Sequence, residues 1–285
     1  MTFRAKANNA EAGASGGILR GRKPSGRHSP SAAAPTVLLF GDSHSDAIQR
    51  AVARRLTKGG VAPLKVHRLL KKHWKSGVVV GDTTLEDFLG IIGGLRASDI
   101  VLSMVGGNQH AVFSTIQHPV PFDFLEPGAE AVIAPAVEII PHRVVASFFA
   151  DWLKKGDGRS IEAIRNATKA RVIHVIPPPP KADNAFINAH HETVFAREGI
   201  SAQGVSPPAL RMRFWRLQTR LLAKFCKSIG VEVLMPPGRT LDEEGFLGKD
   251  FYAKDATHAN SAYGEFVLRE VDKLVRRATK VQRSK

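Results

Sequence analysis

The sequence of 285 residues contains a single cysteine, Cys226, which excludes an intramolecular disulfide and any cysteine-rich metal site. Long apolar runs are also missing. No stretch of about 18 apolar residues occurs, so we expect no transmembrane helix. The N-terminal residues lack the apolar central region of a secretory signal. These absences predict a cytoplasmic protein, in which Cys226 is a small buried hydrophobic residue on a helix.

Acidic residues are scarce beside basic ones: 26 Asp and Glu against 41 Lys and Arg give a net charge of +15. Such an excess attracts nucleic acid, an anionic membrane surface or an acidic substrate. Nucleic acid is not favoured, because no helix-turn-helix, zinc-finger or RNA-binding signature occurs. Residues 1–34 are rich in Gly, Ala, Ser and Pro and predict a disordered basic leader. Residues 278–285 predict a basic tail, which leaves one domain over 35–277.

Five short apolar segments do not alternate with polar residues, which is typical of strands buried on both faces. They lie at 37–40, 64–70, 98–105, 171–176 and 231–235. Helical patterns separate them, at 46–56, 85–95, 141–155, from about 160, at 210–229 and at 261–277. This order predicts an α/β domain with a five-stranded, mainly parallel sheet covered on both faces. Residues 181–209 predict a long irregular connection near the functional edge.

The segment 210–229 is the clearest amphipathic helix, with six apolar residues at helical spacing on one side: Leu210, Phe214, Leu217, Leu221, Phe225 and Ile229. The other side carries six cations and no acid: Arg211, Arg213, Arg216, Arg220, Lys224 and Lys227. We interpret this basic side as a solvated face. If it binds a ligand, an anionic saccharide or a phosphate-bearing carrier suits it better than DNA.

Chemistry-bearing residues follow the strand ends. Ser43 comes directly after the strand at 37–40, at the sheet edge where open α/β folds carry their chemistry. An esterase needs a hydroxyl nucleophile, a base in reach, a group that orients the base, and donors aimed at the oxyanion. Ser43 would attack, His258 would take its proton, and Asp255 would hold the imidazole in the correct tautomer.

The predicted oxyanion donors are the backbone amides of Ser43 and Gly81 and the side-chain amide of Asn108. Glycine at position 81 lets a backbone amide approach a substrate closely. Four further residues are expected to line the pocket: Asp42, His44, Gly107 and His110. Taken singly, Ser43 and Asp255 could be helix caps and Gly106-Gly107 a turn. The occurrence of all these groups in order at strand ends favours a site.

Four blocks resemble those of the SGNH, or GDSL-like, hydrolases, a superfamily of esterases, lipases, thioesterases and carbohydrate acetylesterases. The blocks are Gly41-Asp42-Ser43-His44-Ser45, Gly81-Asp82-Thr83, Gly106-Gly107-Asn108-Gln109 and Asp255-Ala256-Thr257-His258. The resemblance implies a flavodoxin-like three-layer α/β/α fold, no metal, no cofactor, and the roles given above. Gln109 departs from the family pattern, which commonly has an Asp after the Asn.

Three functions remain open at this point. The first is hydrolysis of a carboxylic ester with a small acyl group, such as acetyl on a carbohydrate, through an acyl-enzyme. The second is transfer of that acyl group to a sugar hydroxyl, since Gly-Asp-Ser-His also resembles the modules attached to some bacterial O-acyltransferases. The third is a catalytically silent module whose basic surface binds an anionic polymer. The intact Ser43, Gly81, Asn108, Asp255 and His258 favour an enzyme that acts on a small-molecule or saccharide ester.

Overall fold

A computed structural model describes residues 34–61, 63–72, 77–128, 137–191 and 193–283. All of the predicted leader except Ala34 lies outside these residues, as do the last two residues of the predicted tail. The residues from Ala34 onward form one compact unit. The final helix continues to Arg283, beyond the end predicted at residue 277.

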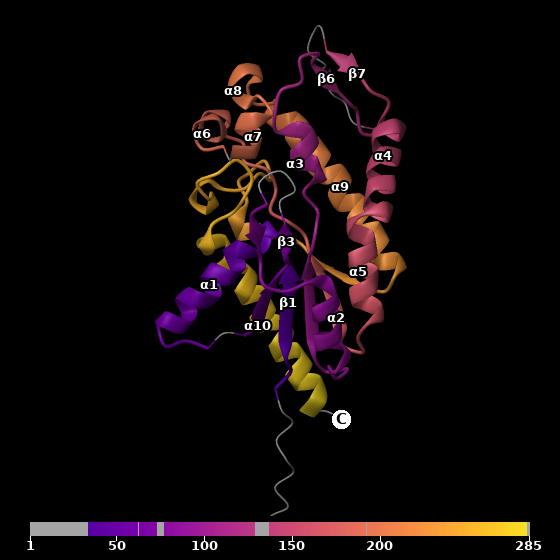
Figure 1. The fold of residues 1–285 in the computed structure, drawn as a ribbon, viewed down its shortest axis with the longest axis vertical. Helices are drawn as coiled ribbons and strands as arrows, with labels where there is room; N and C mark the ends of the chain where they lie inside the picture. Colours follow the sequence, from indigo (N-terminus) through magenta and orange to yellow (C-terminus); the bar gives the residue numbers. More distant parts are fainter. Residues whose placement is uncertain (1–33, 62, 73–76, 129–136, 192, 284–285) are drawn as a thin grey trace, which may run out of the picture. The chain divides into compact units, whose positions relative to one another are not determined.

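Five parallel strands form the central sheet, in the order β2-β1-β5-β8-β9 (Figure 1). The strands are β1 (Val37–Gly41), β2 (Lys65–Arg68), β5 (Ile100–Met104), β8 (Arg171–Val175) and β9 (Glu232–Leu234). In β1, Leu39 pairs with Val66 on one side and with Leu102 on the other. Counted within the sheet, the order is 2-1-3-4-5, which is that of flavodoxin-like folds. The predicted fold class is confirmed.

Helices cover both faces of this sheet. α1 (Asp46–Thr57) and α10 (Ser261–Arg283) pack on one face, and α2 (Leu85–Gly93), α5 (Asp157–Asn166) and α9 (Pro208–Ser228) pack on the other. Figure 1 shows the short helices α3, α6, α7 and α8 beyond the carboxyl ends of the strands. Their bounds are Gln109–Ser114, Asn184–Ala189, Thr193–Arg197 and Ile200–Gln203. α4 (His142–Lys155) packs against α9.

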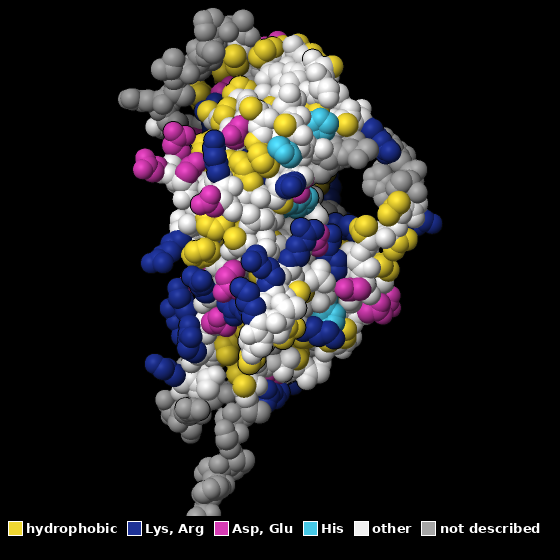
Figure 2. Space-filling view, turned by 90° about the vertical axis from the view of Figure 1, so that its left-hand side faces the viewer, with side chains coloured by type: hydrophobic (Ala, Val, Ile, Leu, Met, Phe, Trp, Pro, Cys, Tyr) yellow, Lys and Arg dark blue, Asp and Glu magenta, His cyan; other side chains and the backbone are white. Residues whose placement is uncertain are grey.

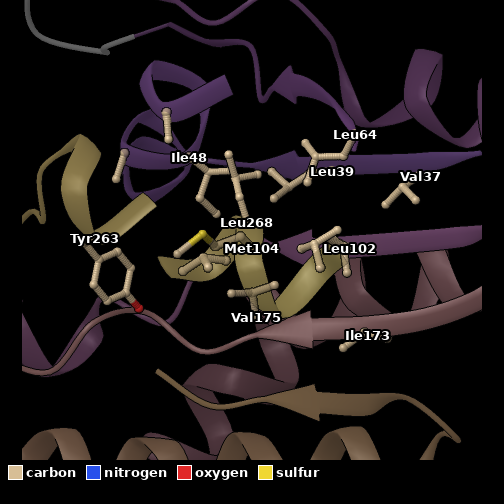
Figure 3. Close-up of a cluster of buried hydrophobic side chains, with 14 of the residues drawn as sticks. Val37, Leu39, Ile48, Leu64, Leu102, Met104, Ile173, Val175, Tyr263 and Leu268 are labelled. Atoms are coloured by element: carbon tan, nitrogen blue, oxygen red, sulfur yellow. The ribbon is translucent and has the colours of Figure 1, made fainter. Parts of the chain in front are cut away.

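Successive strand residues enter opposite layers of the core because side chains alternate along a strand. Leu39 packs with α1 and α10, whereas Leu38 and Phe40 pack with the helices of the other face. Figure 3 shows the first layer, in which Leu39 and Leu102 lie near Leu268. Apolar residues at every position of β1 therefore fill two cores, which is why the strand does not alternate in polarity.

Two pairs of very short strands and three 3₁₀ helices complete the described residues. β3 (Lys71–Lys72) pairs with β4 (Val79–Val80), and β6 (Phe122–Asp123) pairs with β7 (Glu138–Ile139). The 3₁₀ helices are η1 (Ser43–Ser45), η2 (Gly238–Thr240) and η3 (Lys249–Phe251). The prediction of an irregular connection over 181–209 is wrong, because α6, α7 and α8 lie within it. Helices of four to six residues are too short for a helical period to show in the sequence.

The basic side of α9 is only partly the solvated face that its pattern predicts. Arg211 is buried, and its guanidinium donates to the carbonyl oxygens of Lys181 (2.8 Å) and Ser206. Burial lowers the pKa of Arg211 to about 10. Arg213 and Arg220 pair with Asp123 and Glu126, from a segment some 90 residues earlier in the chain, while the other three cations are exposed. Acids this distant cannot be seen in a helical pattern.

Much of the remaining positive charge lies on α1 and α10. A surface cleft of about 520 Å³ between these helices is lined by Arg54, Arg55, Lys58 and Arg269, together with Glu265. Arg55 donates to both Glu265 (2.8 Å) and Asp272 (3.0 Å). Figure 2, which turns the α1 side toward the viewer, shows Lys and Arg side chains gathered there with acids among them.

The single cysteine, Cys226, is buried on α9 as predicted, and burial raises the pKa of its thiol to about 12.

Close contact between α1 and α10 depends on Gly264. A Cβ at this position would lie 2.1 Å from the carbonyl oxygen of Ala47. We therefore expect Gly264→Ala to force the helices apart and to lower the free energy of unfolding by about 1–3 kcal/mol or more. Gly90, exposed on α2 with open space at its Cβ position, is the matched control. Gly90→Ala should raise stability by up to about 1 kcal/mol, since alanine favours a helix. Chemical denaturation of both variants tests this, and equal effects would contradict the packing argument.

Candidate active site

Two polar loops meet where the strand order of the sheet reverses. Ser43 follows β1, and Asn108 follows the neighbouring strand β5. From β1 the chain passes to β2 on one side, and later to β5 on the other. In open α/β folds the crevice at this switch point is where ligands bind.

Asp42 ties the two loops together. Its Oδ2 accepts the amide of Gly106 at 3.0 Å, and its own amide donates to Met104 at 3.2 Å. Burial raises the pKa of Asp42, against the opposing effects of Lys71 and of the Gly106 and His44 amides. This carboxyl is 3% exposed and lies beneath the loops, so it fixes their separation and presents no surface to the cavity above.

A second carboxylate supports the loop that carries Asn108. Asp157, at the start of α5, accepts hydrogen bonds from the Gly107 amide (3.2 Å) and from the side chain of Gln109. Gly106 has a φ of +72°, and any Cβ there would overlap the Asp157 carboxylate. The sequence has Gln109 where the family pattern has an acid, and in the structure Asp157 supplies a carboxylate next to that glutamine.

Asp255 and His258 form a hydrogen-bonded pair in the loop before α10. The Asp255 Oδ2 lies 3.1 Å from the His258 Nδ1, and its Oδ1 accepts the His258 amide at 2.7 Å and the Thr257 amide at 3.0 Å. Burial alone would raise the pKa of Asp255. The bonds from His258 and the charge of Lys181 outweigh burial and hold that pKa well below its usual range. An ionised Asp255 favours the tautomer of His258 with its proton on Nδ1.

Lys181 is fully buried beneath this pair. Its Nζ donates to the carbonyl oxygens of Ala253 (2.8 Å) and Asp255 (2.5 Å), and lies 3.5 Å from the Asp255 Oδ1. The rings of Phe186 and Tyr252 lie 4.9 and 5.0 Å from the ammonium group. A buried ammonium needs such partners to offset the loss of water. Lys181 thereby fixes the loop that carries Asp255.

A neutral histidine, His44, lies beside the pair, and a second, His110, lies near His44. The ring of His44 is 4.8 Å from that of His258, and burial together with the neighbouring His258 and His110 holds the pKa of His44 well below its usual range. Burial also lowers the pKa of His110 to about 4, although its Nδ1 lies 3.1 Å from the Gly107 carbonyl oxygen. Neither ring therefore competes with His258 for a proton at neutral pH.

One cavity of about 710 Å³ collects the candidate groups and is called here the serine cavity. Ser43, His44, Asn108 and His258 line it, with Asp255 behind His258. Its other lining residues are Ala111, Val112, Phe113, Ile116, Gln117, His118, Phe122, Phe195, Glu198, Gln203 and Thr257. The Asn108 side chain makes no capping bond to α3, although Asn108 stands at its N-cap. An amide, a hydroxyl and an oriented imidazole thus share one cavity.

Gly107, His110 and Gly81 are not among the described residues that line the serine cavity. Gly81 has a φ of +91° and is exposed. A Cβ at this position would lie 2.2 Å from the carbonyl oxygen of Leu69, so close backbone packing requires glycine here. Its service as an oxyanion donor stays a prediction.

Sequence patterns did not single out Lys181, Asp157 or Phe195. Lys181 follows four consecutive prolines and precedes Ala182-Asp183-Asn184, which gives no signal of burial. Asp157 lies just before the helix predicted from about residue 160, and no pattern marked it. Phe195 lies in α7, in the segment expected to be irregular near the functional edge, and its position on the cavity wall agrees with that location.

No family model matches this sequence, and no curated protein matches it either. Among solved structures, a carbohydrate acetylesterase from Sinorhizobium meliloti is 15% identical with a TM-score of 0.43, covering 85% of this chain and 99% of its own. A GDSL-like lipase from Bacteroides thetaiotaomicron is 14% identical with a TM-score of 0.43, covering 85% and 88%.

A phospholipase A1 from Streptomyces albidoflavus is 11% identical with a TM-score of 0.41, covering 85% of this chain and 99% of its own. Likenesses this distant do not bear on the activity of the chain.

The described helices of the chain include none that is long and apolar enough to cross a bilayer.

The lowered pKa of Asp255 predicts a dependence of stability on pH. The folded-state pKa lies below that of the unfolded chain, so its stabilising contribution is fully present above about pH 5 and is lost as the pH falls toward the folded-state pKa. Asp255→Asn cannot titrate. We expect its free energy of unfolding to fall less steeply than that of the wild type between about pH 5 and pH 2. Urea denaturation across this range measures both slopes, and parallel curves would contradict the assignment.

Proposed function

We propose that the chain is a serine ester hydrolase of the SGNH type, acting on a carboxylic ester through an acyl-enzyme. The observation that carries the proposal is the Asp255–His258 hydrogen bond behind a cavity that Ser43 and Asn108 also line. The fold supports it, because the cavity lies at the sheet edge where such folds carry their chemistry.

In the proposed first step, the Ser43 Oγ attacks the acyl carbon while His258 takes the proton of the Ser43 hydroxyl. The Asp255 carboxylate stabilises the imidazolium that forms, and Lys181 holds that carboxylate in place. The oxyanion accepts hydrogen bonds from the Ser43 amide and the Asn108 side chain, with the Gly81 amide as the third proposed donor. His258 then gives its proton to the leaving alcohol.

In the second step, water attacks the acyl-enzyme and His258 acts as the base again. The carboxylic acid leaves and Ser43 regains its proton, so atoms and charges balance over the cycle. His258 can act as the base only in its neutral form. The neutral His44 beside it adds no positive charge to the site at working pH.

Labelling with a fluorophosphonate probe tests the nucleophile. We expect the wild type to be labelled and to hydrolyse p-nitrophenyl acetate, and Ser43→Ala to lose both properties while keeping its fold. Ser228→Ala, which changes an exposed serine at the end of α9, is the matched control. If folded wild-type protein takes no label, a silent binding module becomes the better interpretation, and a steep loss of polyanion binding with salt would support it.

Asn108→Ala tests the oxyanion donor. Removal of one such donor typically lowers kcat by about 10²- to 10³-fold with little effect on KM, because the bond strengthens only in the transition state. Asn166→Ala, at an exposed position of α5, should leave turnover unchanged. Steady-state kinetics on p-nitrophenyl acetate measures both variants. A normal kcat for Asn108→Ala would remove this residue from the oxyanion site.

A further inference from the structure

The serine cavity differs in charge from the rest of the chain. The sequence has 41 Lys and Arg against 26 Asp and Glu, yet no Lys or Arg is among the described residues that line this cavity. Within that lining, Glu198 is the one side chain that carries a permanent charge at neutral pH. The mechanism proposed above gives this carboxylate no task.

Basic side chains around the site are bound to acids of their own. Lys71 lies 3.6 Å from the Asp42 Oδ2, beneath the loop of Ser43. The Arg213 Nε donates to the Asp123 Oδ1 at 2.8 Å, in a second cavity that adjoins the first. Each of these pairs largely cancels its own charge. The negative charge of Glu198 is therefore not offset by either cation.

The backbone that carries Glu198 is fixed by the turn between α7 and α8. The Gly199 amide donates to the Ala196 carbonyl oxygen at 3.3 Å, and the Ala202 amide donates to the Gly199 carbonyl oxygen at 3.0 Å. Ile200 is fully buried and anchors the turn. The Glu198 side chain is exposed, and within the described part of the chain it has no hydrogen-bond or ion-pair partner. Its carboxylate is thus accessible to a ligand in the cavity.

Three phenylalanines line the same cavity: Phe113 and Phe122 from the segment 109–123, and Phe195 from α7. Aromatic rings attract cations through their negative faces, and a carboxylate attracts them through its charge. A primary ammonium group would lose hydrogen bonds to water beside such rings. A quaternary ammonium group has no N–H to lose, so it is complementary to rings and carboxylate together.

We propose that the serine cavity selects an ester that carries a quaternary ammonium group, and that Glu198 and the phenylalanine rings bind this group. The proposal rests on the proposed function and names its substrate class, because the acyl carbon of the ester must lie at Ser43. Glu198 supplies the opposite charge, and Phe195 supplies an apolar surface three residues away in the chain. The ammonium group takes no part in the proton transfers, so the reaction balances as before.

The first test compares two acetyl esters of nearly the same shape. One is acetylcholine, and the other is neohexyl acetate, its uncharged isostere in which carbon replaces the ammonium nitrogen. We expect Glu198→Gln to lower the kcat/KM for acetylcholine relative to neohexyl acetate by about 3- to 10-fold, because the attraction between opposite charges is lost while the shape of the side chain is kept. Glu162→Gln, at an exposed position of α5, changes the net charge equally and should leave the ratio unchanged.

Binding of tetraethylammonium gives a second readout, which does not depend on turnover. Calorimetry with the full chain should show an affinity that falls about 3- to 10-fold in Glu198→Gln and is unchanged in Glu162→Gln. Phe195→Leu keeps an apolar side chain but removes the ring. It should weaken the binding of tetraethylammonium by about 2- to 5-fold, the usual effect of one cation–ring contact.

The ratio of the two esters decides the proposal where both are hydrolysed, and the tetraethylammonium affinity decides it where they are not. A value that Glu198→Gln leaves as in the wild type would overturn the ammonium site. Equal changes in Glu198→Gln and Glu162→Gln would also overturn it, because they would reflect net charge alone. Failure of the proposed function is a different result, since it would show as the absence of Ser43-dependent labelling in the wild type.

Discussion

The site depends on one buried carboxylate. Asp42 joins the end of β1 to the end of β5 through the Gly106 amide, and thus sets the distance between the loop of Ser43 and the loop of Asn108. Buried carboxylates are costly unless hydrogen-bonded, so the loops have little freedom to separate. Asp157 likewise accepts a hydrogen bond from the amide of the next residue, Gly107. The candidate reacting groups are therefore placed by two acids that are not among the described residues lining the serine cavity.

Buried groups also hold His258 in place. Lys181, Asp255 and His258 form a chain of charge and hydrogen bonds from the interior to the cavity wall. Each group offsets part of the free-energy cost of burying its neighbour, which explains how Lys181 can lie fully inside the domain. The positive charge of Lys181 lies behind Asp255, and the neutral His44 lies beside His258. Together they set the electrostatic environment of His258, the proposed base.

Sequence patterns predicted the sheet because its strands are short, apolar and bounded by glycine or proline. They singled out Ser43, Asn108, Asp255 and His258 because each follows a strand or precedes a helix. The patterns missed what depends on contacts between distant segments. The helical pattern predicted a solvated Arg211, but in the structure Arg211 donates to the carbonyl oxygens of Lys181 and Ser206. The short helices α6 to α8 leave no periodic pattern in the sequence. Roles for Gly81 and the other predicted donors stay predictions, since they require a bound substrate.

The tight contact of Gly264 with Ala47 has a consequence for synthesis of the chain. Helix α10 covers the first strands of the sheet, yet it is the last described element to leave the ribosome. Until it emerges, the face of β1 and β5 that it covers lacks the α10 side chains that bury it. His258 emerges only just before α10. This layer of the core and the candidate site are therefore completed together, when the last described helix docks.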